Sequence, residues 1–307
     1  SDVYKRQIIA RAKLLNYLYH NKATPKIRIP NLTYPATLNA FIESGWEVEL
    51  ADTDRYGVVL PTRRSPNLFH CVVGLYGRKP WATDTMVNKY DYDIIVDGAQ
   101  HWLVADGNVG YGMAISFDPT KNLPASGNGG AIVTNDKALY EFAMEYRNNG
   151  YNALFSQHTI SGTNSKMSEQ DCAHMLVRAK YIDEWQRRRE QIAEYYRERC
   201  KDLPVIVLND GTESHANQKF VLYSEYRNLI HGGMILSGIE TKKHYEYVLG
   251  DLPMSKSLTK PDMISTSVML SKGVVSLPLY PELTDSEVES IASKLCDVFA
   301  KGNTFSE

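Results

Sequence analysis

Short apolar runs rich in β-branched residues alternate with segments of helical periodicity through the first half of the chain. This alternation is typical of an α/β fold with a largely parallel central sheet flanked by helices. In such a sheet, ligands bind where the carboxyl ends of the strands lead into loops. The runs predict strands at Lys26–Ile29, Glu47–Leu50, Phe69–Gly74, Asp93–Val96, Met113–Phe117 and Ala131–Val133.

Helical segments are predicted before and between these strands. The first begins at Ile8, and a second, Tyr34–Ser44, is expected to end at Gly45. The residues before Ile8, Ser1–Gln7, read SDVYKRQ, which resembles translated sequencing-adapter sequence. We therefore expect this segment to be non-native and the true beginning of the chain to be missing.

The pattern changes after Gly162. Ser168 and Asp171 form a capping box, and a long helix is predicted to follow as far as about Cys200. We therefore expect a large domain over residues 8–200 and a smaller C-terminal α+β domain over residues 201–307. The elements predicted in the smaller domain are strands at Val205–Leu208 and Val274–Ser276 and a terminal helix at Asp285–Phe299.

Composition narrows the class of protein. The 307 residues are 43% hydrophobic and 23% charged with a net charge of −2, as in an ordinary soluble globular protein. A near-neutral chain without a separate Lys/Arg block lacks the signature of nucleic-acid binding. No apolar run approaches the ~20 residues of a membrane span, and no signal peptide is visible. The four cysteines show no metal-ligand spacing, so we expect reduced thiols, no metal and a cytoplasmic location.

Lys121 is the first candidate for chemistry. It lies in a loop after a predicted strand and precedes Gly127–Gly130 (Gly-Asn-Gly-Gly), where backbone can approach another group closely. A lysine amine condenses with carbonyl groups, and burial favours its neutral, reactive form. A solvated surface lysine followed by a hairpin turn explains the same residues. The glycines are not a nucleotide P-loop, because no Gly-Lys-Ser/Thr follows them.

Asp97 is the second candidate, directly after the predicted strand Asp93–Val96. A carboxylate at this depth needs a partner, because burying an unpaired charge is costly. Asp97 either caps the turn that follows or pairs with the protonated ring nitrogen of pyridoxal phosphate. The second pairing keeps the ring cationic, so that it acts as an electron sink during transamination. The residue alone leaves both interpretations open.

The chain carries six short motifs in this order: Asn31–Ala40 (NLTYPATLNA), Asp97-x-x-Gln100, Ser116-Phe117-x-Pro119-Thr120-Lys121-Asn122, Gly162-x-Asn164-x-Lys166-Met167-Ser168, Gly238-Ile239-x-Thr241-x-x-His244-Tyr245 and Ser276–Pro281 (SLPLYP). Together they resemble the DegT/DnrJ/EryC1/StrS family of pyridoxal-phosphate-dependent sugar aminotransferases, which have the type I fold. The resemblance extends from about Ile8 to about Leu295. Each motif is modest, but six in the family's order argue against chance.

The resemblance implies roles for the matching residues. Lys121 would hold pyridoxal 5'-phosphate as a Schiff base and later move the proton between substrate carbon and cofactor. Asp97 would face the pyridine nitrogen, and Gln100 would lie near the ring hydroxyl. Ser116 would bind the phosphate, and Tyr34 would stack on the pyridine ring. Ordinary core and turn positions remain the alternative for Tyr34 and Ser116.

The resemblance also implies a homodimer with shared active sites. Asn164 would reach the cofactor phosphate of the neighbouring subunit, although it could instead cap a loop. His244 either touches substrate or ends a strand, and His101 is either a packing or a catalytic residue. The sequence leaves these alternatives open.

The chain departs from the family pattern at several places. The family's Gly-Thr or Gly-Ser segment, which opens a helix onto the cofactor phosphate, is expected just before Ile8 but SDVYKRQ stands there, so we expect weaker cofactor binding. Asn128 replaces an acidic residue, and Lys166 replaces an arginine, which removes any bidentate contact. The stretches 54–72 and 77–93 are shorter than is usual in the family.

The reaction implied is transfer of an amino group from an amino acid, expected to be glutamate, to the keto carbon of a nucleotide-linked deoxysugar, for polysaccharide or secondary-metabolite synthesis. Lysine at position 121 argues against the related dehydratases, which have histidine there. The alternative is a non-catalytic relative that acts as a scaffold or regulator. A NAD-linked sugar epimerase is excluded, because no GxGxxG follows a strand. Sugar, nucleotide and ring position stay open.

Overall fold

The computed structural model describes residues 2–20, 24–59, 67–80, 94–107, 109–212, 214–258 and 265–302. Its central feature is a six-stranded sheet in the order β2-β1-β3-β4-β5-β6. Neighbouring strands are parallel except for β5 and β6, which are antiparallel. The strands are β1 (Lys26–Pro30), β2 (Glu47–Ala51), β3 (Leu68–Val73), β4 (Ile94–Asp97), β5 (Gly112–Ser116) and β6 (Gly130–Val133).

The six predicted strands are confirmed to within one residue at the ends that the structure describes, as is the largely parallel sheet. Residue 93 lies outside the described residues. The strands are buried because apolar side chains such as Ile29, Val72 and Ile95 point to both faces, where helices and loops cover them. Residue type and burial therefore agree with a sheet that is enclosed on both sides.

Helices α1 (Asp2–His20) and α2 (Pro35–Ser44) pack on each other, and α1 also contacts β5 and α4 (Lys137–Tyr146). The first helix is longer than predicted, since it begins at Asp2 rather than Ile8. The segment expected to be non-native therefore forms its first turns, and Arg6 in that segment is buried. The apolar face of α1 includes Ile8 and Ile9 in the core.

Both ends of α2 follow from local sequence. Tyr34 is the N-cap with extended backbone, and Pro35 occupies the first helical position, where its missing N–H is not needed. Gly45 ends the helix with a left-handed φ of 88°, and its N–H bonds to carbonyls of the last turn. The predicted end at Gly45 is confirmed. The helix thereby places Tyr34 at the carboxyl end of β1.

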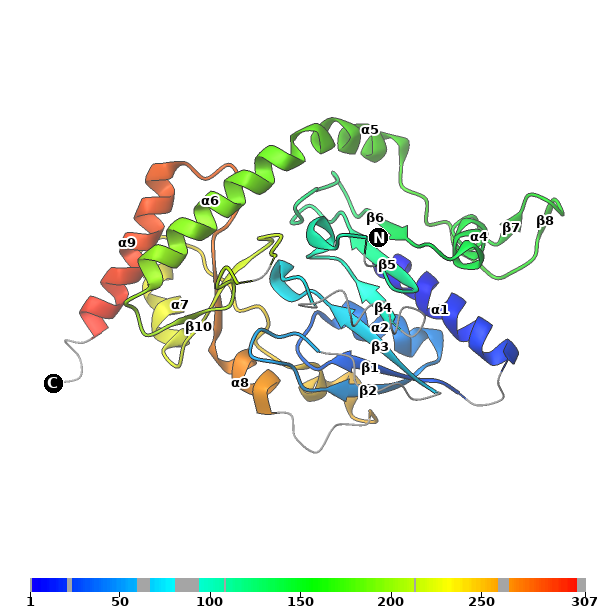
Figure 1. Cartoon of the computed structure of the whole chain (residues 1–307), viewed down its shortest axis with the longest axis horizontal. Coiled ribbons are helices and arrows are strands. Elements are labelled where there is room, and N and C mark those ends of the chain that lie inside the picture. The colour runs from blue at the N-terminus through cyan, green and yellow to red at the C-terminus, as the bar shows by residue number, and fades with distance from the viewer. Residues whose placement is uncertain are drawn as a thin grey trace.

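A long helical arm crosses the molecule at the top of Figure 1. It consists of α5 (Glu169–Arg178), the 3₁₀ turn η4 (Ala179–Tyr181) and α6 (Ile182–Cys200). The predicted N-cap is confirmed, because the Ser168 hydroxyl accepts a hydrogen bond from the Asp171 amide. The hairpin β7 (Tyr151–Asn152) and β8 (Gln157–His158) extends from the side of the large sheet near α4.

A second, antiparallel sheet in the order β11-β10-β9 forms the smaller part of the molecule. Its core joins Phe220 and Val275 of the strands to Ile192 of α6, Ile230 of α7 and Leu295 of α9. The elements are β9 (Ile206–Val207), β10 (Phe220–Tyr223), β11 (Val274–Leu277), α7 (Arg227–Leu236), α8 (Ser265–Gly273) and α9 (Asp285–Gly302). Short 3₁₀ turns are η1 (Leu75–Gly77), η3 (Trp102–Val104), η5 (Leu249–Asp251) and η6 (Pro253–Ser255).

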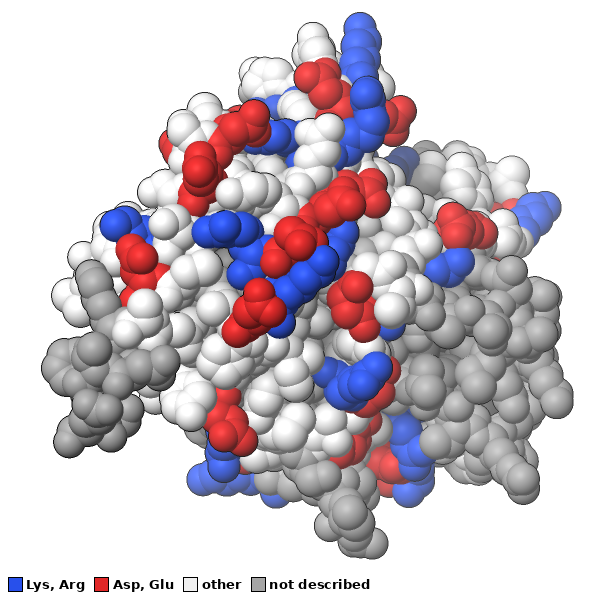
Figure 2. Space-filling view, turned by 60° about the vertical axis from the view of Figure 1, so that its left-hand side comes forward, with Lys and Arg blue, Asp and Glu red and all other residues white. Residues whose placement is uncertain are grey.

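Backbone hydrogen bonds join the small sheet to the carboxyl edge of the large one. The amides of Ala216 and Lys219 donate to the carbonyls of Gly77 (2.7 Å) and Tyr76 (3.1 Å). On the side that carries α6 and α9, acidic and basic side chains are interspersed (Figure 2). No described helix combines the length and the apolar character that a membrane crossing requires.

Candidate active site

Five of the six predicted site residues, all except Asn164, lie at the carboxyl edge of the large sheet. Asp97 is the last residue of β4, and Ser116 is the last residue of β5. Tyr34 follows β1, Gln100 follows β4, and Lys121 lies in the loop after β5. Because parallel strands end at the same edge, residues far apart in sequence meet there.

Asp97 is buried, with 3% of its surface exposed, and both carboxylate oxygens are bonded. Arg6 donates from Nε to Oδ2 at 2.6 Å and from Nη2 to Oδ1 at 2.9 Å. The Thr37 hydroxyl donates to Oδ2 at 2.7 Å, and the Ala99 amide donates to Oδ1 at 3.2 Å. Burial raises the pKa of Asp97, but Arg6 and these hydrogen bonds outweigh burial and hold that pKa below its usual range. Asp97 is therefore a carboxylate.

Gln100 and Tyr34 meet through Tyr245. The Gln100 amide nitrogen donates to the Tyr245 hydroxyl at 3.1 Å, while its oxygen accepts from the Tyr76 amide. The rings of Tyr34 and Tyr245 lie 5.9 Å apart. Burial raises the pKa of Tyr245 to about 12, so its hydroxyl stays protonated. Tyr34 itself is 55% exposed, so much of its side chain is accessible.

Ser116 is fully buried at the end of β5. Its hydroxyl oxygen accepts a hydrogen bond from the Asp118 amide at 3.3 Å, which begins the turn that leads to Lys121. The Lys121 amide donates to the Asp118 carbonyl at 2.9 Å. Gln218 donates from its side chain to the Thr120 carbonyl at 3.1 Å. The loop is thus fixed by contacts from both parts of the molecule.

Lys121 lines a cavity of about 850 Å³ between the helical arm, the Lys121 loop and the small sheet. Among the six predicted site residues, it alone reaches this cavity within the described part of the chain. Lys219, Lys242, Arg178 and Arg189 give the cavity a basic lining. Rings on its wall come from Tyr181, Trp185 and Tyr280.

The two histidines left open by the sequence differ in position. His244 lines the cavity, and its Nδ1 lies 2.9 Å from the Ser276 hydroxyl. Burial and then the charges of Lys219, Lys242 and Lys121 lower the pKa of His244 to about 3, so the ring is neutral. His101 is buried away from the cavity, and neither ring nitrogen has a partner among the described residues. Burial lowers its pKa to about 4.

Asn164 is exposed and forms a backbone bridge with Asn148 of the same chain. Beside it, the buried amine of Lys5 donates to the Ser165 carbonyl at 3.1 Å. The start of α1 is thereby tied to the segment that carries Asn164. Within one chain, these contacts do not bring Asn164 to the cavity that Lys121 lines.

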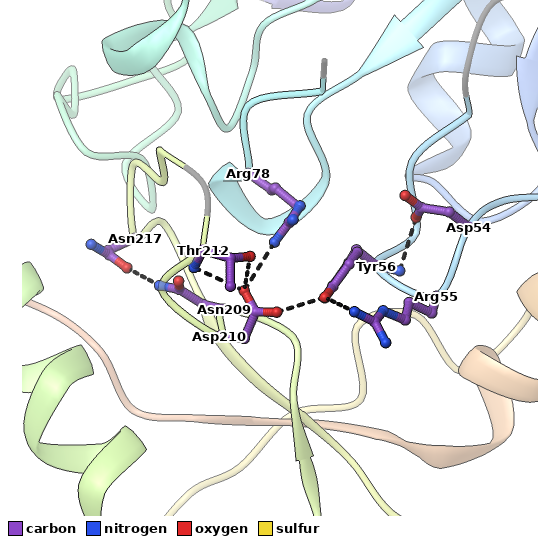
Figure 3. A network of polar contacts seen from close by, with 8 residues as sticks. All are labelled: Asp54, Arg55, Tyr56, Arg78, Asn209, Asp210, Thr212 and Asn217. Carbon is purple, nitrogen blue, oxygen red and sulfur yellow. Dashed lines mark hydrogen bonds and ion pairs between the residues drawn. The ribbon is translucent and has the colours of Figure 1, made fainter. Parts of the chain in front are cut away.

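A polar network holds the small sheet against the edge of the large one (Figure 3). The Tyr56 hydroxyl, after β2, donates to Asp210 Oδ2 at 2.5 Å. The Arg78 guanidinium lies 3.7 Å from the centre of the Tyr56 ring and 3.5 Å from Asp210 Oδ1. Burial raises the pKa of Asp210, but hydrogen bonds from Tyr56 and Thr212 and the charge of Arg78 lower it to about 2. The carboxylate therefore stays charged and links the segments that carry Tyr56, Arg78 and Thr212.

Four residues for which the sequence predicted no role contact the site residues or line the cavity. Arg6 and Thr37 bond Asp97, Tyr245 joins Gln100 to Tyr34, and Lys219 faces the cavity. Thr37 and Tyr245 belong to the motifs, so their positions carried a signal. Arg6 lies in the segment that was expected to be non-native, and Lys219 is a single lysine before an apolar strand, so neither position carried such a signal.

The largely parallel sheet, with a lysine and a buried carboxylate at its carboxyl edge, agrees with an aminotransferase of fold type I. The model of the DegT/DnrJ/EryC1/StrS aminotransferase family matches residues 85–296, and the chain belongs to this family. The fold class expected from the sequence is thereby confirmed.

Two relatives are each 30% identical to the chain. One is the erythromycin biosynthesis sensory transduction protein EryC1 of Saccharopolyspora erythraea, where the match covers 81% of this chain and 67% of that protein. The other is dTDP-3-amino-3,4,6-trideoxy-alpha-D-glucose transaminase of Streptomyces venezuelae, where the match covers 85% of this chain and 67% of that protein.

Solved structures share the fold at lower identity. The DegT DnrJ EryC1 StrS aminotransferase from Brucella abortus superposes with a TM-score of 0.81 at 22% identity, covering 95% of this chain and 83% of that one. Helicobacter pylori PseC, an aminotransferase involved in the biosynthesis of pseudoaminic acid, superposes with a TM-score of 0.85 at 18% identity. The match covers 98% of this chain and 85% of that one.

Pyridoxal phosphate carries an aldehyde and a pyridine ring, and the ring is a planar cation when its nitrogen is protonated. Lys121 offers an amine on the cavity wall. Asp97 already binds a planar cation, the guanidinium of Arg6, through two hydrogen bonds. The donor set therefore fits the cofactor in kind. The same contact opposes binding, since Asp97 cannot bond a ring nitrogen until Arg6 leaves.

Proposed function

We propose that the protein transfers an amino group to a nucleotide-linked keto-deoxysugar, with pyridoxal phosphate as cofactor. The observation that carries the proposal is the position of Lys121, on the wall of a cavity at the same sheet edge as the buried carboxylate of Asp97. Membership of the aminotransferase family supports it. So do relatives named as transaminases of dTDP-linked amino-sugars.

Lys121 and Asp97 carry the proposed chemistry. When bound, pyridoxal phosphate supplies an electron sink for the negative charge that develops on the substrate carbon. Lys121 would hold the cofactor through its amine, and the same amine would move a proton to or from the substrate carbon as general acid and base. Once Arg6 has left, the Thr37 hydroxyl and the Ala99 amide still donate to the Asp97 carboxylate, which would then pair with a protonated ring nitrogen.

Three further residues are proposed to position the cofactor. Gln100 uses one N–H on Tyr245 and keeps a second N–H for the ring hydroxyl. Ser116 accepts one hydrogen bond from the Asp118 amide, which leaves its own O–H for the phosphate. The exposed ring of Tyr34 offers its face for stacking.

The cavity supports a large, anionic substrate. Its volume of about 850 Å³ lies within the range of sites for cofactor-sized ligands, and several lysines and arginines line it. We propose a nucleotide-linked sugar as amino acceptor and glutamate as donor, in polysaccharide or secondary-metabolite sugar synthesis. The four cysteines are free, which suits the reducing cytoplasm where we place the reaction.

The proposed assembly is a homodimer in which Asn164 of each subunit reaches the cofactor phosphate of the other. Apolar side chains support a partner surface, because Leu154 and Phe155 at the β7–β8 hairpin and Leu176 and Val177 on α5 are exposed.

Mixing Lys121→Ala protein with Asn164→Ala protein tests whether the subunits share their active sites. If they do, mixed dimers should regain activity, because one of the two sites then has both Lys121 and Asn164. If each subunit has a separate site, the mixture should stay inactive.

The domain boundary is also proposed, with residues 8–200 as the cofactor-binding domain and 201–307 as the smaller domain. Two cores support it. One core contains Ile9, Phe41 and Ile95 of the large sheet and its helices, and another contains Phe220 and Val275 of the small sheet. The helix α6 packs on the second core, so it contacts the smaller domain although the proposed boundary places it in the large one.

A direct assay tests the proposed reaction. The protein, supplied with pyridoxal phosphate and glutamate, is given a panel of keto-sugar nucleotides, and aminated products are detected by mass. We expect one class of sugar nucleotide to gain an amino group, and Lys121→Ala to form no product. A protein that binds the cofactor but aminates no member of a broad panel would support the non-catalytic alternative.

A further inference from the structure

The basic lining of the cavity contains one lysine whose charge is not balanced. Lys242 pairs with Glu240 at 3.2 Å, and Arg178 donates to the Pro124 carbonyl at 2.8 Å. Arg189 donates to the Leu279 carbonyl at 2.7 Å. The Lys219 amine has no hydrogen bond or ion pair among the residues that the structure describes. It stands just before β10 and shares the cavity wall with Lys121.

The surroundings of Lys219 favour an anion. Its side chain is only partly exposed, and an ammonium removed from water needs a partner. Burial, then Lys121, Arg189 and Lys242, lower the pKa of Lys219 to about 8, against an opposing effect of Asp118. The Asp118 carboxylate is itself engaged, because Thr120 donates to it from both the amide and the hydroxyl. Near neutral pH the amine is therefore a cation without a carboxylate partner.

We propose that Lys219 binds an oxyanion of the substrate beside Lys121. Two sources offer this chemistry: the carboxylate of the amino donor and the diphosphate of the nucleotide-linked sugar. The inference deepens the proposed function and rests on it, because an anion held here lies next to the amine that performs the transfer. Of the neighbouring lysines, Lys121 is assigned to the cofactor, and Lys242 is 64% exposed and already paired.

The polarity of the cavity agrees with this assignment. Lys121, Lys219 and the neutral His244 lie together, since each of the lysines lowers the pKa of His244. Of the acidic side chains on the wall, Glu240 is paired with Lys242, and Glu282 and Glu287 stand near the start of α9. An anionic ligand is therefore attracted to the end of the cavity that contains Lys121 and Lys219.

Calorimetric titration tests the proposal. The full chain is first given pyridoxal phosphate, which fills the cofactor's own phosphate site, and is then titrated with inorganic pyrophosphate or with 2-oxoglutarate. Lys219→Met should weaken binding of at least one anion by about 10- to 100-fold, the value of a hydrogen bond to a charged group. Lys219→Arg should retain most of the affinity. Lys272→Met, which removes an exposed lysine from α8 outside the cavity, should change nothing.

The two probes distinguish the two sources. If Lys219→Met loses affinity for pyrophosphate alone, Lys219 binds the diphosphate. If it loses affinity for 2-oxoglutarate alone, Lys219 binds the donor carboxylate. Unchanged affinity for both anions in Lys219→Met, with far-UV circular dichroism like that of the parent, overturns the proposal. Cofactor attachment at Lys121 is measured separately, so failure of the anion site and failure of the proposed reaction give different results.

Discussion

The contact between Arg6 and Asp97 leads to the sharpest prediction on stability. Replacing Arg6 with leucine leaves the Asp97 carboxylate buried without its cation, although Thr37 and the Ala99 amide still donate to it. Breaking one side of a buried ion pair costs about 3–5 kcal/mol, because an uncompensated charge stays in the interior. Since two of the four hydrogen bonds remain, we expect a loss of about 3 kcal/mol in the free energy of unfolding.

Equilibrium unfolding in urea at pH 7 measures this loss, with Arg28→Leu as the matched control. Arg28 also donates from Nε to a carboxylate, Glu49, but both side chains of that pair are 22% exposed. Its replacement should cost at most about 1 kcal/mol. The double variant Arg6→Leu/Asp97→Leu should recover most of the stability, because a buried ion pair replaced by apolar groups is often neutral. Equal midpoints for Arg6→Leu and Arg28→Leu would refute the reasoning.

The same variant should respond more strongly to the cofactor. Pyridoxal phosphate offers Asp97 a new cationic partner once Arg6 is gone, so it should stabilise Arg6→Leu by more than it stabilises the parent.

The contribution of Asp97 to the free energy of unfolding depends on pH with a defined sign. The pKa of Asp97 is lowered in the folded protein, so its contribution is present above its unfolded pKa of about 3.9 and is lost as pH falls.

Two further predictions concern the neighbourhood of the cavity. Tyr245→Phe removes the acceptor of the Gln100 N–H and should cost about 1 kcal/mol in unfolding free energy, with weaker cofactor binding in an absorbance titration. Binding of pyrophosphate or 2-oxoglutarate should fall as pH rises through about 8, because Lys219 loses its proton there. His244 does not contribute in this range, since it is neutral above pH 3 or so. A pH-independent affinity would contradict that assignment. The charged groups that face Lys219 are Lys121, Lys242, Arg189 and Asp118.

The sequence predicted those features of the fold that depend on local pattern. The strands follow from apolar runs, and α2 follows from Pro35 at its start and Gly45 at its end. The cap of α5 follows from the spacing of Ser168 and Asp171. In each case neighbouring residues alone specify the backbone, so no distant contact was needed.

Contacts between distant segments could not be predicted in the same way. Arg6 and Asp97 are 91 positions apart, and nothing in the local pattern joins them. The motifs placed Asp97, Gln100 and Lys121 at one sheet edge, as the structure has them. They did not indicate that Asp97 is held by Arg6, nor that Lys219 lies on the cavity wall, because both facts depend on how the two parts of the chain pack.

Covalent capture at Lys121 tests the central claim most directly. The protein is incubated with pyridoxal phosphate, reduced with borohydride and digested, and the peptides are analysed by mass spectrometry. We expect a visible absorbance band before reduction and a pyridoxyl group on the peptide that contains Lys121, with neither in Lys121→Ala. Labelling spread over exposed lysines, with the Lys121 peptide unmodified, would contradict the account.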